Sequence, residues 1–189
     1  MSRFPLLRTA ALLLLLSVMA ACRKSPPPSP PAPTAVEYLE AGKKALLAGD
    51  AATARPALDN AVRLDPQSAE AFLYLGLAAA RQDDAEHAEA ALARAIRLAP
   101  DSPRPLEALG ILRYDQKRFD DARQSLTQAA EHHSGNPQTY YYLGNIAMFS
   151  GNCPTALDAY RKAMAKDPDY APATQEYRAA IAACAKMGR

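Results

Sequence analysis

Residues 69–100 read AEAFLYLGLAAARQDDAEHAEAALARAIRLAP, and this stretch decides how the chain folds. Apolar residues recur at every third or fourth position through two helix-length segments, which predicts two amphipathic helices. Asp83 and Asp84 separate the segments, and their carboxylates are suited to capping the second helix. The stretch is therefore expected to form a helical hairpin.

The same pattern recurs every 34 residues before and after this stretch. In the first segment it marks glycines, at Gly42, Gly76, Gly110 and Gly144, and in the second it marks alanines, at Ala54, Ala88, Ala122 and Ala156. Bulky residues keep the same register at Leu58, Leu92, Leu126 and Tyr160, and closing prolines stand at Pro66, Pro100 and Pro168. Ser134 takes the place of the remaining proline, where Gly135 and Pro137 are expected to end the helix.

A 34-residue period with Gly in the first helix and Ala, a bulky residue, Ala and Pro around the second is the pattern of tetratricopeptide repeats. The chain therefore resembles a tetratricopeptide repeat (TPR) protein. The resemblance implies an all-α, right-handed α-solenoid. One helix pair cannot bury its own apolar face, so stability must come from stacking neighbours. We expect four repeats over 35–168, with units at 35–68, 69–102, 103–136 and 137–170, and a capping helix at 171–189.

The first 34 residues predict export and attachment to a membrane. Residues 1–21 carry Arg3 and Arg8 before an uncharged apolar run that is too short to span a bilayer, as in a signal peptide. The sequence before Cys22 resembles the lipobox of bacterial lipoproteins, which implies lipidation of Cys22, followed by a Pro-rich tether over 22–34. An ordinary cleaved signal with an incidental cysteine is the alternative. The resemblance implies a lipid-anchored protein of the bacterial cell envelope, at the outer membrane and facing the periplasm.

Cys153 and Cys184 are expected to form a disulfide. Cys153 opens the second helix of repeat four, and Cys184 lies late in a capping helix that should run antiparallel to it. An oxidising compartment favours the bond; the alternative is two separate small core residues. His132 and His133 are adjacent and so point in different directions on a helix. Together with the isolated His87 they predict surface positions and no metal site, and no cofactor is expected.

By resemblance, the first helices of the repeats line a concave groove that binds a peptide. The expected lining residues flank each marker glycine: Leu39, Lys43, Leu73, Leu77, Arg81, Arg104, Ile111, Tyr114, Tyr141, Asn145, Met148 and Phe149. Many are apolar or aromatic, and an exposed apolar patch is typical of an interaction surface. The alternative is that several of them pack against the next repeat. The Lys, Arg and Asn clamp by which some TPR proteins hold a carboxylate is not present, because those places hold mainly Leu and Ile.

The function predicted from these features is a non-enzymatic scaffold that binds a partner protein or peptide in the cell envelope. No nucleophile elbow, phosphate-binding Gly-rich loop or HExxH motif occurs in the sequence. Without Arg3 and Arg8 the chain has 20 basic and 20 acidic residues, so nucleic acid is not the expected partner. Because these catalytic motifs are missing, no small-molecule substrate is expected either. The resemblance implies a role like that of the repeat lipoproteins that help to assemble pili, secretins or outer-membrane complexes. A self-associating structural module and a regulator of cell-wall enzymes are the alternatives.

Overall fold

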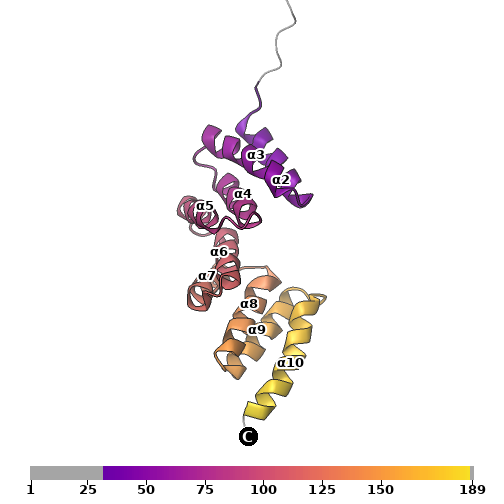
Figure 1. The fold of residues 1–189 in the computed structure, drawn as a ribbon. Helices are drawn as coiled ribbons and strands as arrows, with labels where there is room; N and C mark the ends of the chain where they lie inside the picture. Colours follow the sequence, from indigo (N-terminus) through magenta and orange to yellow (C-terminus); the bar gives the residue numbers. More distant parts are fainter. Residues whose placement is uncertain (1–31, 188–189) are drawn as a thin grey trace, which may run out of the picture. The chain divides into compact units, whose positions relative to one another are not determined.

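The computed structural model describes residues 32–187, and within them the only regular elements are α-helices (Figure 1). All of these helices belong to one unit that begins at Pro33. Their bounds are α2 Ala35–Leu47, α3 Ala51–Leu64, α4 Ala69–Ala80, α5 Ala85–Leu98, α6 Pro103–Asp115, α7 Phe119–Glu131, α8 Pro137–Phe149, α9 Cys153–Lys166 and α10 Ala171–Met187. The predicted start of each first helix agrees with these bounds.

The helices pack as four antiparallel pairs in chain order, α2 with α3, α4 with α5, α6 with α7 and α8 with α9. Each second helix packs on the first helix of the next pair, and each first helix also contacts the next first helix. The last helix, α10, packs against α9 and α8 as the capping helix of the prediction. The all-α solenoid inferred from the 34-residue period is therefore confirmed.

Polar residues at the helix ends explain where the helices begin. Thr34 and Glu37 form a capping box at α2, in which the Thr34 side chain accepts from the Glu37 N–H at 3.3 Å. Asp50 and Asp84 cap α3 and α5 in the way expected of turn carboxylates. These side chains satisfy backbone N–H groups that the first turn of a helix leaves without partners.

The turn inside each repeat uses one left-handed residue at the same place in the 34-residue register. Gly49 and Gly151 have φ of 79° and 68°, and Asp83 and Lys117 adopt 58° and 62° at the equivalent positions. Glycine carries no steric cost in this region, whereas a residue with a side chain does. Aspartate tolerates this region better than most residues do, so the steric cost falls mainly on Lys117 in the third repeat.

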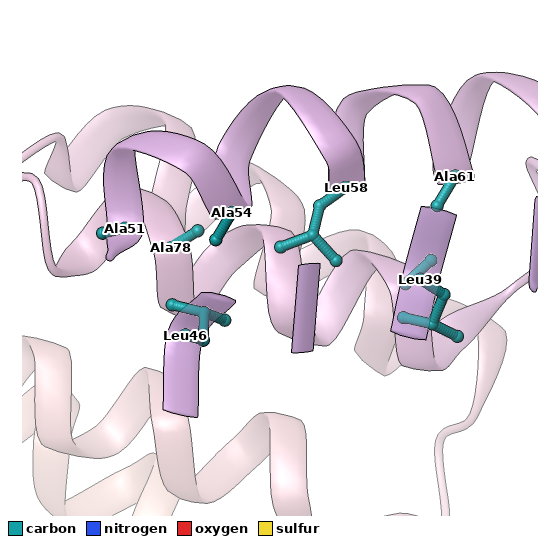
Figure 2. Packing of buried hydrophobic residues seen from close by; sticks show 8 residues of the cluster. Leu39, Leu46, Ala51, Ala54, Leu58, Ala61 and Ala78 are labelled. Carbon is teal, nitrogen blue, oxygen red and sulfur yellow. The ribbon is translucent and has the colours of Figure 1, made fainter. Parts of the chain in front are cut away.

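The marker glycines are the points of closest approach inside each helix pair. A Cβ on Gly76 would lie 2.7 Å from the Cγ of Leu92, and the equivalent pairs in the other repeats are as tight. Leu92 is completely buried at this crossing. Figure 2 shows the first repeat, where Leu58 lies in a cluster with Leu39, and Ala78 of α4 joins it from the next repeat. Stacking therefore completes a core that one pair leaves open.

A buried polar network occupies the place where the third closing proline is missing. Ser134 is fully buried and donates its hydroxyl to Oε1 of Glu107, which is itself only 7% exposed. Asn136 donates to the other carboxylate oxygen of Glu107 at 3.2 Å, and the Thr139 hydroxyl lies 3.1 Å from that of Ser134. A proline could supply none of these bonds, so the departure from the repeat pattern follows from the need to satisfy a buried carboxylate.

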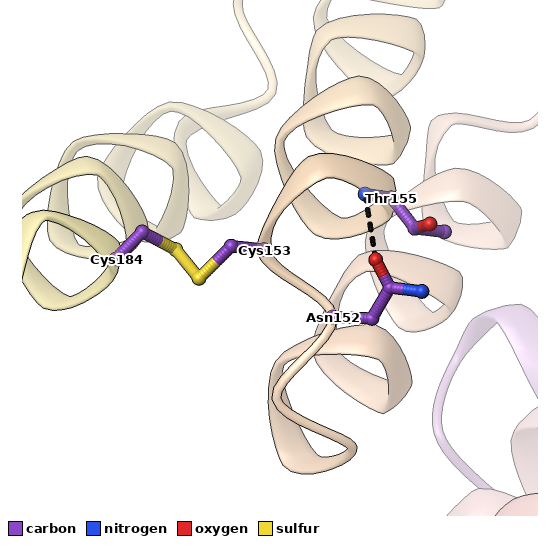
Figure 3. The surroundings of a disulfide bond; sticks show 4 residues. All are labelled: Asn152, Cys153, Thr155 and Cys184. Carbon is purple, nitrogen blue, oxygen red and sulfur yellow. Dashed lines mark hydrogen bonds between the residues drawn. A yellow bond between two sulfur atoms is a disulfide. The ribbon is translucent and has the colours of Figure 1, made fainter. Parts of the chain in front are cut away.

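A disulfide joins the capping helix to the fourth repeat. Cys153 at the start of α9 and Cys184 in α10 are bonded, with Cα atoms 5.8 Å apart, while Asn152 caps α9 by accepting from the Thr155 N–H at 3.2 Å (Figure 3). Ala173 and Ala180 of α10 are buried, whereas Ile181 is 48% exposed. The cap is therefore held by small residues, by the half-buried Tyr177 and by the covalent bond.

The predictions for the beginning of the chain fall outside the described residues. The signal peptide over 1–21, lipidation of Cys22 and most of the tether over 22–34 belong to this part. Within residues 32–187, no helix has the length and apolar character needed to cross a bilayer.

Candidate functional site

The candidate site is the groove, the surface that the first helices α2, α4, α6 and α8 present between successive repeats. Contacts of α2 with α4, α4 with α6 and α6 with α8 place these helices in a row. Each contributes side chains at the same positions relative to its marker glycine. Differences between these side chains divide the groove into a polar part, an open slot and an aromatic part.

The polar part lies between α2, α4 and α6 and is built around Tyr74. Lys43 donates to Glu40 at 2.8 Å and to Glu70 at 3.1 Å, and these hydrogen bonds raise the pKa of the lysine. The Lys43 ammonium lies 5.4 Å from the centre of the Tyr74 ring. Arg104 lies 5.5 Å from the same ring and donates to the Tyr74 hydroxyl at 3.0 Å. One tyrosine is thus held between two cations.

The aromatic part lies between α6, α8 and the residues that follow α9. Its aromatic cluster comprises Tyr114, Phe119, Tyr141, Tyr142, Phe149, Tyr160 and Tyr170. The Phe119 and Phe149 rings stack with centroids 4.8 Å apart, and Tyr114 lies 4.7 Å from Tyr142. Phe149 remains 66% exposed in spite of this stacking. A large aromatic ring therefore stands at the edge of the cluster with most of its surface in water.

One core residue reaches the groove through the fourth repeat. Tyr160 of α9 is 1% exposed, and its hydroxyl donates to Oδ1 of Asn145 at 2.8 Å. Burial raises the pKa of Tyr160 far above its ordinary value, and burial also raises the pKa of Tyr114. Both phenols therefore stay protonated, as hydrogen-bond donors, at neutral pH.

The slot lies between the polar and aromatic parts, where α4 meets α6. Its volume is about 330 Å³. Leu77, Ala80, Ala108, Ile111 and Leu112 form its apolar walls, and Asp83, Ala85, Asp115 and Gln116 surround the turn side. Both carboxylates are exposed at the rim. The slot can take an apolar group of the size of one side chain.

Ten of the twelve residues expected to line the groove are at least partly accessible. Phe149, Arg81 and Arg104 are exposed, and Lys43, Leu77, Ile111, Tyr114, Tyr141, Asn145 and Met148 are half-buried. Arg81 also donates to the backbone oxygen of Leu46 at 2.6 Å. This hydrogen bond satisfies a carbonyl group in the last turn of α2 and leaves fewer donors of Arg81 for a ligand.

Leu39 and Leu73 do not line the groove as expected. Leu39 is 9% exposed and belongs to the core of the first repeat, and Leu73 is 4% exposed and packs with Leu92 and Leu109. Both side chains are covered because each helix pair packs closely on the next one. For these two residues the alternative of packing against a neighbouring repeat is correct.

Sequence reasoning missed three aromatic residues that shape the groove, Tyr74, Phe119 and Tyr142. Tyr74 and Tyr142 stand at one equivalent position, two residues before their marker glycines, and Phe119 opens a second helix. A signal was present, because the position of Tyr74 and Tyr142 holds Ala108 in the repeat between them. A comparison of equivalent positions in successive repeats would have shown that the size of the side chain varies at this position.

The histidines take part in local contacts. Nδ1 of His87 lies 2.8 Å from Oδ1 of Asp84, which also accepts from Arg55 through its other oxygen, and these hydrogen bonds lower the pKa of Asp84 to about 2. His133 is the left-handed residue after α7. In the described part of the chain, no group of three or more His, Cys, Asp or Glu side chains is arranged to hold a metal ion.

Several solved structures share the arrangement of these helices. A crystal structure of MamA has 24% sequence identity and a TM-score of 0.65, and the match covers 77% of this chain and 80% of that chain. YrrB, described as a TPR protein with an unusual peptide-binding site, has 21% identity and a TM-score of 0.63, with 76% and 74% covered. PilF of Pseudomonas aeruginosa has 21% identity and a TM-score of 0.64, with 79% and 76% covered. The right-handed solenoid is therefore the fold of this chain.

The fold and the groove define a helical-repeat protein of the kind that presents a binding surface on stacked hairpins. A family model of the tetratricopeptide repeat matches residues 39–103 and 107–171, which is more than half of the chain. The protein therefore belongs to the tetratricopeptide repeat family. No curated protein matches the sequence at a significant level.

Proposed function

We propose that this protein is a non-enzymatic scaffold that holds a segment of a partner protein in the groove. The observation that carries the proposal is the stacked pair of Phe119 and Phe149, which keeps a 66% exposed aromatic ring beside a half-buried aromatic cluster. Exposed apolar surface is costly in water and usually marks an interaction site. Aromatic residues fixed by stacking supply contact area at a low cost in conformational entropy, as binding hot spots do.

Membership of the TPR family supports a binding role rather than catalysis. YrrB, which has the same fold, is described as possessing a peptide-binding site, and a groove between first helices is suited to an extended or helical segment. Apolar anchors of that segment would contact Phe149 and Met148, and its polar groups would reach Asn145. The partner proposed on this basis is a protein or peptide.

The place of action that we propose is the bacterial cell envelope. The chain would be attached through a lipid on Cys22, and a Pro-rich tether would hold its helical repeats in the periplasm. The support is the charged and apolar leader before Cys22 and the proline content that follows it. Assembly of pili, secretins or outer-membrane complexes is the kind of process in which such a scaffold would serve. Labelling cells with a radioactive fatty acid tests the anchor: the wild-type chain should be labelled and the Cys22→Ala variant should not.

The binding role is tested by crosslinking in cells. A photoreactive amino acid replaces Phe149, and the matched control replaces Leu64, which is 45% exposed on α3 outside the groove. Capture of a protein from position 149 but not from position 64 supports the proposed scaffold function. The purified partner should then bind the wild-type chain and should not bind the Phe119→Ala variant. Crosslinks only between copies of this chain favour the structural module, and the same products from both positions contradict a role for the groove.

A further inference from the structure

The slot exists because two alanines, Ala80 and Ala108, stand where both neighbouring junctions carry large side chains, while the position of Ala85 holds Ala51 before it and Phe119 after it. Ala80, Ala85 and Ala108 line it at the junction of α4 and α6. Shifted by 34 residues, the same positions at the next junction hold Tyr114, Phe119 and Tyr142, whose rings contact one another and fill the space.

The preceding junction is filled in a different way. There, Leu46 and Tyr74 take the places of Ala80 and Ala108, and Leu46 is buried. Arg81 stands at the position equivalent to Asp115 and closes the junction by donating to the Leu46 oxygen. Of the three junctions between consecutive repeats, the middle one therefore has small residues at both first-helix positions.

The rim of the slot is acidic. Asp115 and Asp83 stand on its turn side, and within residues 32–187 no Lys, Arg or His side chain forms an ion pair with either of them. The acidic residue next to Asp83 differs in this respect, because Asp84 is paired with Arg55. Desolvation beside the apolar walls raises the pKa of Asp115, although the residue remains exposed at the rim.

We infer that the slot receives a lysine or arginine side chain of the segment held in the groove, with the apolar stem between α4 and α6 and the cationic head at Asp115. This inference rests on the proposed function. Long basic side chains commonly bury their methylene groups along apolar surface while the charged head stays at a polar edge. A negatively charged side chain would meet Asp115 as a like charge, and a purely apolar one would remove more water from that carboxylate without pairing it.

The aromatic part continues the same recognition. Tyr114 precedes Asp115 on α6 and belongs to the aromatic cluster, so this cluster begins beside the slot. A residue next to the basic one in the bound segment would therefore contact an aromatic ring. The expected ligand is therefore a segment in which a lysine or arginine is followed closely by an apolar or aromatic residue. In the polar part both carboxylates, Glu40 and Glu70, are already paired with Lys43, so this part adds no demand for a second basic residue.

The first test selects ligands from a random 12-residue peptide library displayed on phage, using the purified chain as bait. Enrichment of lysine or arginine one to four residues from an aromatic or large apolar residue is the expected result. Enriched peptides that bind through Phe149 and show no excess of basic residues would overturn the slot inference and leave the proposed function in place. Failure to enrich any peptide above an unrelated bait would overturn both.

The second test measures the charge at Asp115 directly. A selected peptide and its analogue with norleucine in place of lysine differ in the ammonium group and share the apolar stem. The lysine peptide should bind the wild-type chain up to about fivefold more tightly, the range of a partly exposed ion pair. In Asp115→Asn this difference should disappear, as a double-mutant cycle requires. An unchanged ratio in the variant would contradict a contact with Asp115.

The third test fills the slot with the side chain that both neighbouring junctions carry. Ala108→Tyr should weaken binding of the lysine peptide by more than about tenfold, because the methylene stem returns to water. Ala52→Tyr, exposed on α3, is the matched control and should bind as the wild type does. If Ala108→Tyr does not fold, Ala80→Leu introduces the side chain found at Leu46 and must give the same loss. Full binding by a folded filled variant would show that the slot is not used.

Discussion

Removal of the bond between Cys153 and Cys184 should lower the free energy of unfolding by about 3 to 4 kcal/mol. The two residues are 31 apart in sequence. In the chain-entropy model, closing a loop of this length removes about 12 cal/mol/K from the unfolded chain, or about 3.7 kcal/mol at 25 °C. Few large apolar contacts of α10 can offset the loss, because its buried residues are Ala173 and Ala180, and Tyr177 is its large side chain that packs, half-buried, on the fourth repeat.

Urea denaturation of the Cys153→Ala, Cys184→Ala double variant, followed by circular dichroism, measures this difference. With an m value of about 2 kcal/mol/M, the unfolding midpoint should fall by nearly 2 M. Wild-type protein in a reducing agent is the matched control and should superimpose on the variant.

Equal midpoints for the oxidised wild type and the double variant would refute this reasoning. So would a reducing agent that shifted the double variant as far as it shifts the wild type, since the variant has no bond between these helices to lose.

Three further predictions concern single residues of the repeats. Gly110→Ala places a Cβ 2.6 Å from the Cγ of Leu126. Overpacking should lower the stability by about 1 to 3 kcal/mol, while the higher helix propensity of alanine returns about 1 kcal/mol. Thermal denaturation measures the net change. Glu107→Ala leaves the buried hydroxyl of Ser134 without its carboxylate and should cost about 1 to 3 kcal/mol in urea, whereas a variant as stable as wild type would contradict the network. The pKa of Asp84 is lowered to about 2 by hydrogen bonds from a histidine and an arginine, so its contribution to stability is present above the unfolded value of 3.8 and is lost as pH falls through about 2. The stability difference between wild type and Asp84→Asn should therefore shrink over that interval, and a difference independent of pH would count against it.

The helices could be predicted because their signals are local and repeat. A glycine such as Gly76 opposite a bulky residue such as Leu92 fixes how two helices cross, and the same spacing occurs four times. Capping residues such as Asp50 and Asp84 gave the starts of second helices for the same reason. Each of these features depends on residues within one repeat.

The groove was harder to predict because its surface depends on packing between repeats. Leu39 and Leu73 were expected to be accessible, yet a neighbouring helix pair covers them. Tyr142 and Phe119 were overlooked because the sequence of one helix does not show which of its side chains contact the next repeat. The slot depends on the absence of bulk at Ala108, which is visible only when side-chain sizes are compared from one junction to the next.

The hydrogen bond from Tyr160 to Asn145 has a spectroscopic consequence. The chain contains nine tyrosines and no tryptophan, so tyrosine emission is not transferred to an indole. Five of those tyrosines belong to the aromatic cluster, where Tyr114, Tyr141 and Tyr142 lie within 6 Å of another ring. A peptide that contacts Asn145 would alter the hydrogen bond of a buried phenol, and the native fluorescence of the protein would report occupancy of the groove without a label.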